Sequence, residues 1–179
     1  MRKPSKAERQ LRKLQATAYH EAGHAVVSLE LGRGFKSVSI EPDDNSLGRI
    51  QNTVLPEWFS PDLNLDDRHK KWIEREVLIF LAGIAAEHRF AGQNNWKGSG
   101  SDFHSAINLA SCMFEGSVLE KYVAFMLERT RAMISHPRVW VQIQAVAEAL
   151  LEHRVLSKKR VREICRIAYT SGAMRRRED

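Results

Sequence analysis

The sequence is poor in cysteine and has no long apolar run. Its two cysteines, Cys112 and Cys165, lack zinc-ribbon spacing and cannot form a four-cysteine metal site, so we expect two small buried side chains in a reducing compartment. The first thirty residues have no apolar stretch typical of a signal peptide. The longest apolar stretch, residues 77–86, is about half a membrane span. These absences predict a soluble, cytoplasmic protein.

The chain also lacks a phosphate-binding loop and any nucleic-acid-binding signature. The segment from Gly32 to Ser37 resembles a phosphate loop only superficially, because its spacing is wrong and a predicted strand follows it. The net charge of +6 and the pI of about 9.5 permit an acidic partner. Much of the basic excess lies at the two ends of the chain, which favours solvated termini over nucleic-acid binding.

What is present is a series of amphipathic helical patterns. Apolar residues recur at helical spacing over residues 5–31, 66–91, 102–114, 118–134, 139–153 and 157–170. Alternating polar and apolar residues at 36–41 and 47–54 predict two strands that form a small β-hairpin. A chain of 179 residues without internal repeats suggests one domain, 1–179, with a basic N-terminal helix at about 5–16 and C-terminal helices at about 118–170. We predict an α+β fold that is predominantly α-helical.

The most informative segment is His20-Glu21-Ala22-Gly23-His24, which has the form H-E-x-x-H. Two histidines four positions apart on a helix point the same way, so both imidazoles can reach one metal ion. The glutamate between them lies close enough to act as a general base toward an attacking water. The apolar residues that follow indicate a buried helix. A helical surface that merely carries two histidines is the weaker interpretation.

A catalytic zinc site usually takes three protein ligands and leaves a fourth position for water. The extended metzincin motif would need a glycine at position 27 and a histidine at position 30, where this chain has Val27 and Glu30. The third ligand must therefore come from elsewhere. The residues alone leave five candidates, which are Glu30, Glu87, His88, Asp102 and His104.

Four segments, in order, resemble the peptidase domain of the FtsH-type AAA proteases. They are the H-E-x-x-H segment at 19–27, the alanine-rich helix with an acidic residue at 81–92, the Gly-Ser loop followed by aspartate and a helix at 98–110, and the helical pair at 150–164. The resemblance covers roughly residues 10–168. The first motif is shared by many zincins, whereas the ordered set is much more specific.

The resemblance implies that His20, His24 and Asp102 are zinc ligands and that Glu21 is the catalytic base. The position of Asp102 at the start of a helix agrees, because the positive helix end favours an ionised carboxylate, although helix capping is the competing interpretation. Glu87 is then expected to accept a proton from a ligand histidine or to form a buried ion pair. His88 and His104 are expected at the surface, with an oxyanion-stabilising role as an alternative for His104.

The predicted function is that of a zinc metalloendopeptidase with one catalytic Zn²⁺, hydrolysing peptide bonds in peptides or unfolded proteins. The alternative is a catalytically idle, zinc-stabilised interaction module or a subunit of a larger assembly; the presence of Glu21 favours the enzyme. The resembling proteins fuse this domain to a membrane-anchored ATPase, and these 179 residues contain neither an ATPase motif nor a membrane segment. An ATPase partner in trans and a homo-oligomer therefore remain open, and no nucleic-acid partner is expected.

Overall fold

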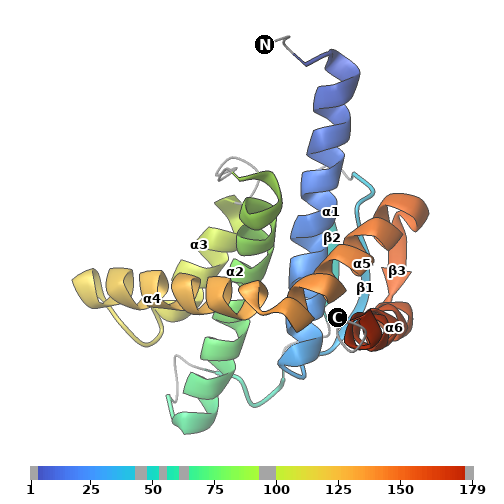
Figure 1. The fold of residues 1–179 in the computed structure, drawn as a ribbon. Helices are drawn as coiled ribbons and strands as arrows, with labels where there is room; N and C mark the ends of the chain where they lie inside the picture. The colour runs from blue at the N-terminus through green and yellow to red at the C-terminus, as the bar shows by residue number, and fades with distance from the viewer. Residues whose placement is uncertain (1–3, 43–47, 53–55, 61–64, 93–99, 176–179) are drawn as a thin grey trace.

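Six helices and three strands make up the described part of the chain, which in this computed structural model comprises residues 4–42, 48–52, 56–60, 65–92 and 100–175. The predicted α+β fold, predominantly α-helical, is confirmed (Figure 1). The helices are α1 (Lys6–Glu30), α2 (Asp67–Ala91), α3 (Gly100–Ala110), α4 (Gly116–Ser135), α5 (Pro137–His153) and α6 (Lys158–Arg175). The strands are β1 (Phe35–Ser39), β2 (Arg49–Asn52) and β3 (Val155–Ser157). None of the helices in these ranges is long and apolar enough to cross a membrane.

Helix α1 begins with a capping box and ends at a glycine. The Ser5 side chain accepts a hydrogen bond from the Glu8 amide, and the Glu8 carboxylate accepts one from the Ser5 amide. Beyond the helix, Gly32 has a φ of 70°, a left-handed conformation that glycine adopts without steric cost. The first half of α1 projects from the rest of the molecule, and the second half is buried (Figure 1).

Helix α2 packs along the buried half of α1. Asp66 caps its N-terminus by accepting hydrogen bonds from the amides of Arg68 and His69, and Gly92 ends it with a φ of 68°. At the crossing with α1, a Cβ on Gly23 would lie 2.6 Å from the carbonyl oxygen of Ala82. Glycine at position 23 therefore sets how closely the two helix backbones approach.

The three strands form an antiparallel sheet in the order β2-β1-β3. The predicted hairpin of β1 and β2 is present; the expected turn between them lies partly outside the described residues. Strand β3 was not predicted. It lies where the sequence suggested only a turn between two helices, and its residue Leu156 pairs with Val38 of β1. The Ser157 hydroxyl accepts a hydrogen bond from the Arg160 amide and so caps the N-terminus of α6.

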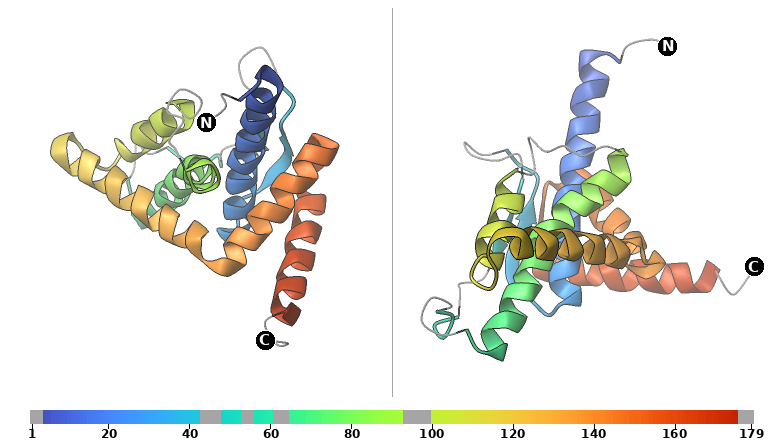
Figure 2. Two further views of the ribbon diagram at one scale, coloured as in Figure 1. Left: turned by 45° about the horizontal axis from the view of Figure 1, so that its top comes forward. Right: turned by 90° about the vertical axis from the view of Figure 1, so that its left-hand side faces the viewer.

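The buried apolar side chains form two clusters. The larger one joins α1, β1, α5 and α6 with part of α2, and the smaller one lies between α2, α3 and α4. An aromatic contact ties the larger cluster together, because the Tyr19 ring stacks on Phe90 at 4.0 Å and lies 5.6 Å from Trp140. The two views in Figure 2 show α4 running across α2 and α3, whereas α5 and α6 cover the other side of α1. Helix α2 is thus shared by both clusters.

Two predicted boundaries need correction near the candidate site. Helix α3 begins at Gly100, so residues 100 and 101 belong to the helix and not to the preceding loop. Asp102 consequently lies inside the first helical turn, where a carboxylate interacts favourably with the exposed amides. Helix α3 also ends at Ala110, four residues earlier than predicted.

Candidate metal centre

His20, His24 and Asp102 meet at the contact between α1 and the start of α3. Their nearest nitrogen and oxygen atoms all lie within 4.8 Å of one another. The Nε2 atoms of the two histidines are 3.1 Å apart, and the Asp102 Oδ2 atom lies 2.8 Å from His20 Nε2 and 3.2 Å from His24 Nε2. Ligand atoms about 2.0–2.1 Å from a tetrahedral zinc are separated by about 3.3 Å. The three donors therefore form a triangle of nearly the size that zinc requires.

Each histidine ring is held by a hydrogen bond at its other nitrogen. His20 Nδ1 lies 3.1 Å from Oε2 of the buried Glu87, and His24 Nδ1 lies 2.7 Å from the carbonyl oxygen of Ile79. A carboxylate or carbonyl oxygen can only accept, so each Nδ1 donates its proton, and in the neutral ring Nε2 carries the lone pair. In its neutral form each imidazole is therefore the tautomer that binds a metal through Nε2.

The backbone of helix α2 at Gly83 packs closely against the imidazole rings of the two histidines. A Cβ on Gly83 would lie 2.4 Å from His24 Nε2 and 2.7 Å from His20 Nε2. Real Cβ atoms do not approach other atoms this closely, so any side chain at position 83 would displace the donor nitrogens. The absence of a side chain at Gly83 thus creates the space in which the donors meet.

The electrostatics of the three donors favour a cation at their centre. Burial alone would lower the pKa of His20, but its hydrogen bonds with Asp102 and Glu87 outweigh burial and raise that pKa to about 10. Burial would raise the pKa of Asp102, yet the charge of His24 and hydrogen bonds from both histidines hold this pKa well below its usual range. One carboxylate and two imidazoles are a donor set that suits a divalent zinc ion.

Glu21 lies beside this group with a carboxylate that is not fully paired. The residue is 5% exposed, and its Oε2 atom has no hydrogen-bond partner among the described residues. Burial raises the pKa of this carboxyl group, while the charges of His24 and His20 oppose the shift. On one side Gly48 approaches so closely that a Cβ there would lie 2.8 Å from both Cγ and Oε1 of Glu21. A buried carboxylate with an unused oxygen is poised to accept a proton.

Comparisons with known proteins match the chain to one family. A model of peptidase family M41 matches residues 7–126, more than half of the chain. The chain belongs to this family. Among its relatives are the ATP-dependent zinc metalloprotease FtsH of Rickettsia felis, 31% identical over 100 residues, and that of Magnetococcus marinus, 34% identical over 104 residues. The rice protein named ATP-dependent zinc metalloprotease FTSH 9, chloroplastic/mitochondrial, is 32% identical over 106 residues.

These three matches cover 54–58% of this chain but only 13–15% of each relative. The chain therefore spans about one seventh of the length of these curated M41 proteins. The chain shares the family, and the zinc-metalloprotease activity is what the names of the relatives state of those proteins.

The other candidate ligands lie apart from the three donors. Glu30 pairs with Arg138 of α5 at 3.2 Å, and His104 Nδ1 lies 2.6 Å from the Gly100 carbonyl oxygen of its own helix. His88 lines a different cavity of about 430 Å³ between α2 and α4. Glu87 touches the group only through the far nitrogen of His20. The structure thus brings the donor atoms of His20, His24 and Asp102 together, whereas Glu87 contacts only the nitrogen of His20 that faces away from them.

Sequence reasoning missed two contributors to this site, the Ile79 carbonyl oxygen and Gly83. The carbonyl leaves no trace in the sequence because every residue has one. Gly83 did leave a signal, since it interrupts the most apolar stretch of the chain at a helix interior where glycine costs about 1 kcal/mol relative to alanine. A glycine in such a position indicates that something approaches the backbone closely.

Proposed function

We propose that this M41 chain is a zinc-dependent metallopeptidase that hydrolyses peptide bonds in peptides or unfolded proteins. His20, His24 and Asp102 would hold one zinc ion, and Glu21 would be the general base. The observation that carries the proposal is the buried, unpaired Oε2 atom of Glu21 beside a triangle of three metal-donor atoms. The names of the relatives, all zinc metalloproteases, support the choice of metal and reaction.

When bound, zinc polarises the scissile carbonyl and lowers the pKa of the attacking water toward neutrality. The residues of the chain do the rest. Glu21 accepts the proton of the attacking water and later delivers it to the leaving amine, and burial suits it to this task by bringing its pKa closer to neutral pH. Glu87 and Ile79 keep the two histidines in the correct tautomer, and Gly83 keeps the space around their Nε2 atoms clear.

Strand β2 offers a place for an extended substrate. It is an edge strand of the sheet formed by the described strands. Gly48, the residue before β2, lies against the Glu21 side chain. Pairing along such an edge gives affinity through main-chain hydrogen bonds and little sequence selectivity. An extended chain is required, so a folded substrate must first open locally.

An idle, zinc-stabilised module explains the site less well. A purely structural zinc is normally closed by four protein ligands, whereas the described residues supply three. Burying a carboxylate with an unpaired oxygen is also costly, and a module without chemistry gains nothing from it. An ATPase partner, a homo-oligomer, the single domain 1–179 and a cytoplasmic location all remain predictions.

The test separates the base from the metal with two matched carboxylate-to-amide variants. Glu21→Gln should keep one zinc per chain and lose casein-peptide cleavage, because an amide does not accept the water's proton. Asp102→Asn should lose zinc as well, because a neutral amide oxygen is a poorer ligand. Zinc content, measured by elemental analysis, and turnover of an unfolded casein are the readouts. Unchanged cleavage by zinc-loaded Glu21→Gln would refute the mechanism.

A further inference from the structure

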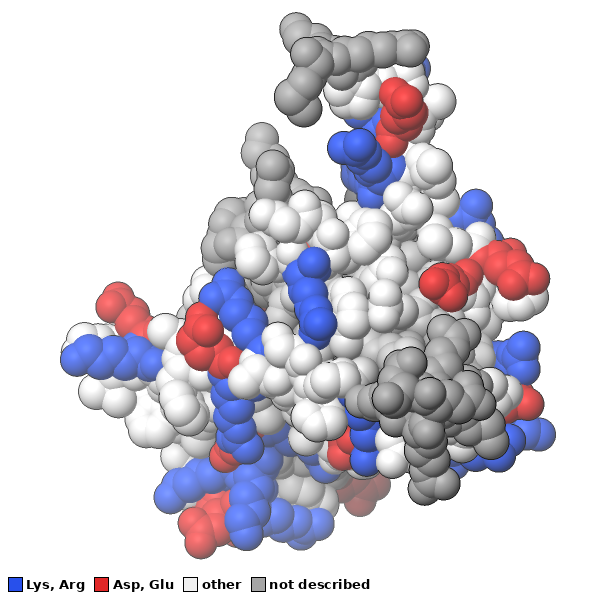
Figure 3. Space-filling model, viewed as in Figure 1, with Lys and Arg blue, Asp and Glu red and all other residues white. Residues whose placement is uncertain are grey.

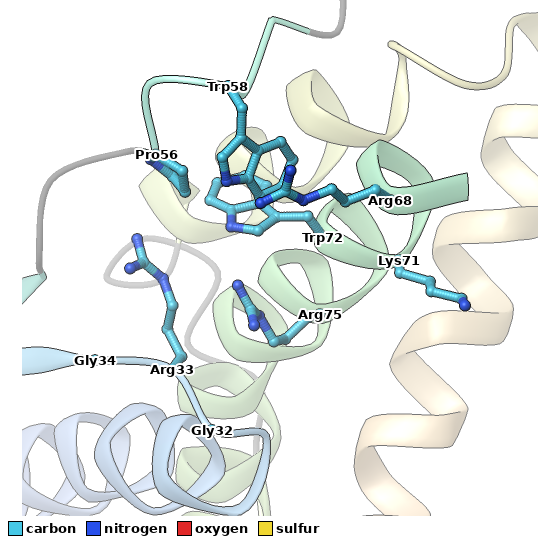
Figure 4. A pocket seen from close by; sticks show the side chains of 9 residues that line it. All are labelled: Gly32, Arg33, Gly34, Pro56, Trp58, Arg68, Lys71, Trp72 and Arg75. Atoms are coloured by element: carbon cyan, nitrogen blue, oxygen red, sulfur yellow. The ribbon is translucent and has the colours of Figure 1, made fainter. Parts of the chain in front are cut away.

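A second cavity lies at the lower end of α1 and α2, below the metal centre. Its volume is about 510 Å³, within the range of ligand-binding sites. Figure 4 shows its lining: Arg33 comes from the turn after α1, Arg68 and Arg75 from α2, and the indoles of Trp58 and Trp72 form one wall. Figure 3 shows basic side chains gathered over the same end of the molecule. The cavity therefore combines positive charge with a flat apolar surface.

Three basic residues and one tryptophan of α2 share one face of the helix. Arg68, Lys71, Trp72 and Arg75 follow the spacing i, i+3, i+4 and i+7, which places them on a single face. Arg68 lies in the first turn of α2, where the helix dipole makes a cation unfavourable. Local helix stability therefore does not account for Arg68, and its position suits the binding of an anion. Lys71 points away from the centre in Figure 4, so the three arginines carry the argument.

The arginines are positioned by their neighbours. Arg33 and Arg75 reach the same buried oxygen, Glu76 Oε1, at 2.8 and 3.5 Å. Arg68 stacks on the Trp58 ring with its guanidinium carbon 3.7 Å from the ring centre. The amides at the start of α2 are already bonded to Asp66. An incoming anion would thus meet guanidinium groups, whose planar forks bind carboxylates in a bidentate manner.

The cavity also lies at the far end of the strand that begins at the metal centre. Gly48, just before β2, contacts Glu21, whereas Asn52 at the end of β2 pairs with Phe35, the neighbour of the cavity residue Gly34. Pro56 of the lining follows β2 in sequence. At about 3.3 Å per residue, four residues of an extended chain span roughly 13 Å along this strand. A peptide paired with β2 would therefore reach from Glu21 to the arginines.

We propose that this cavity binds an acidic side chain of an extended peptide, about four residues away from the peptide bond that faces Glu21. The arginines bind the carboxylate, and the indoles pack against the aliphatic part of the side chain and its neighbours. That the peptide is a substrate rests on the proposed function; that it binds does not.

The experiment measures binding on the full chain carrying Glu21→Gln, so that no cleavage interferes. A fluorescently labelled, extended peptide with one glutamate is compared by anisotropy with the same peptide carrying glutamine. The glutamate peptide should bind roughly tenfold more tightly, as expected for a hydrogen-bonded charge pair, and added salt should weaken the difference. Arg68→Gln and Arg75→Gln should each remove most of it. Arg162→Gln, the same change at an exposed position of α6, should leave it intact.

Equal affinities for the two peptides would overturn the assignment, as would a preference that survives both arginine changes. Displacement of the peptide by inorganic phosphate at lower concentrations than by free glutarate would also overturn it, because the cavity would then serve a phosphorylated ligand. Cleavage by the chain with native Glu21 is measured in parallel. Tight, glutamate-dependent binding without any cleavage would refute the proposed function and support this binding site. Cleavage without a preference for glutamate would support the proposed function and refute this binding site.

Discussion

The two halves of α1 form one continuous helix and are stabilised in different ways. Residues 6–13 are exposed, whereas residues 18–28 are all buried. The exposed half consists almost entirely of strong helix formers and begins with the Ser5 capping box, so it is stabilised locally. The buried half contains Gly23, Val26 and Val27, which are poorer helix formers, and depends on packing against α2 and α5.

This difference explains where the candidate chemistry lies. His20, Glu21 and His24 are polar residues in a buried segment, so each needs partners that only neighbouring elements supply. Helix α2 provides them for the two histidines, through Glu87 and the Ile79 carbonyl oxygen, whereas the Glu21 Oε2 atom has no hydrogen-bond partner among the described residues. The half that is weakest as an isolated helix is the half whose side chains are held most firmly. Four substitutions test this contrast, from the largest expected effect to the smallest.

Gly83→Ala should damage the metal centre most. The new Cβ would lie 2.4 Å from His24 Nε2, and both rings are tied at Nδ1, so they cannot simply move aside. Zinc affinity should fall by more than roughly 100-fold, beyond the usual effect of outer partners. Competition with a chromogenic chelator measures it. Gly100→Ala is the control, because nothing lies within 4 Å of a Cβ there. Unaltered zinc affinity in Gly83→Ala would contradict the close packing of α2 against the two histidine rings.

Gly23→Ala should mainly lower stability. The added Cβ would lie 2.6 Å from the Ala82 carbonyl oxygen and 2.7 Å from the Ala86 Cβ, so α1 and α2 must move apart. Overpacking of this kind costs about 1–3 kcal/mol in the free energy of unfolding. Urea denaturation of the variant beside Gly100→Ala gives the difference. A stability equal to that of the control would mean that the two backbones are not in firm contact.

Gly48→Ala should slow catalysis without loss of metal. The two nearest atoms, at 2.8 Å, belong to the Glu21 side chain, and the third is the Ser39 carbonyl oxygen at 3.0 Å. The side chain gives way more easily than the backbone, so the larger effect falls on the position of the base. A displaced general base lowers kcat by roughly tenfold or more, because proton transfer depends on close geometry. Steady-state kinetics on a peptide, together with zinc analysis, provide the measurement. A rise in KM with unchanged kcat would instead assign Gly48 to substrate binding.

Ser5→Ala should have the smallest and most local effect. Loss of the cap costs about 1 kcal/mol in helix stability, and in the exposed half it appears as fraying of the first turns. Hydrogen exchange should quicken at the amides near Glu8 and stay unchanged at those of residues 18–28. The neighbouring change Lys6→Ala, at an exposed position, should have little effect. Faster exchange in the buried half would show that the two halves are coupled after all.

Much of the secondary structure could be predicted because its signals are local. Asp66 and Gly92 mark the ends of α2, and alternation marks the hairpin. Strand β3 could not be predicted, since three residues carry no periodicity and Leu156 is a strand residue only because it pairs with distant Val38. The short shift at the start of α3 is the ordinary uncertainty of helix ends.

By itself, the sequence determined that His20 and His24 share one face of a helix with Glu21 beside them, because the 3.6-residue repeat of a helix fixes this within five residues. Only the tertiary structure decided that Asp102, 78 residues beyond His24, lies against their Nε2 atoms while Glu87 binds the far side of His20. Both carboxylates fit the sequence pattern, and the choice depends on where α2 and α3 pack against α1. The same packing, made close by glycines that contribute no side chain, creates the space in which the donors meet.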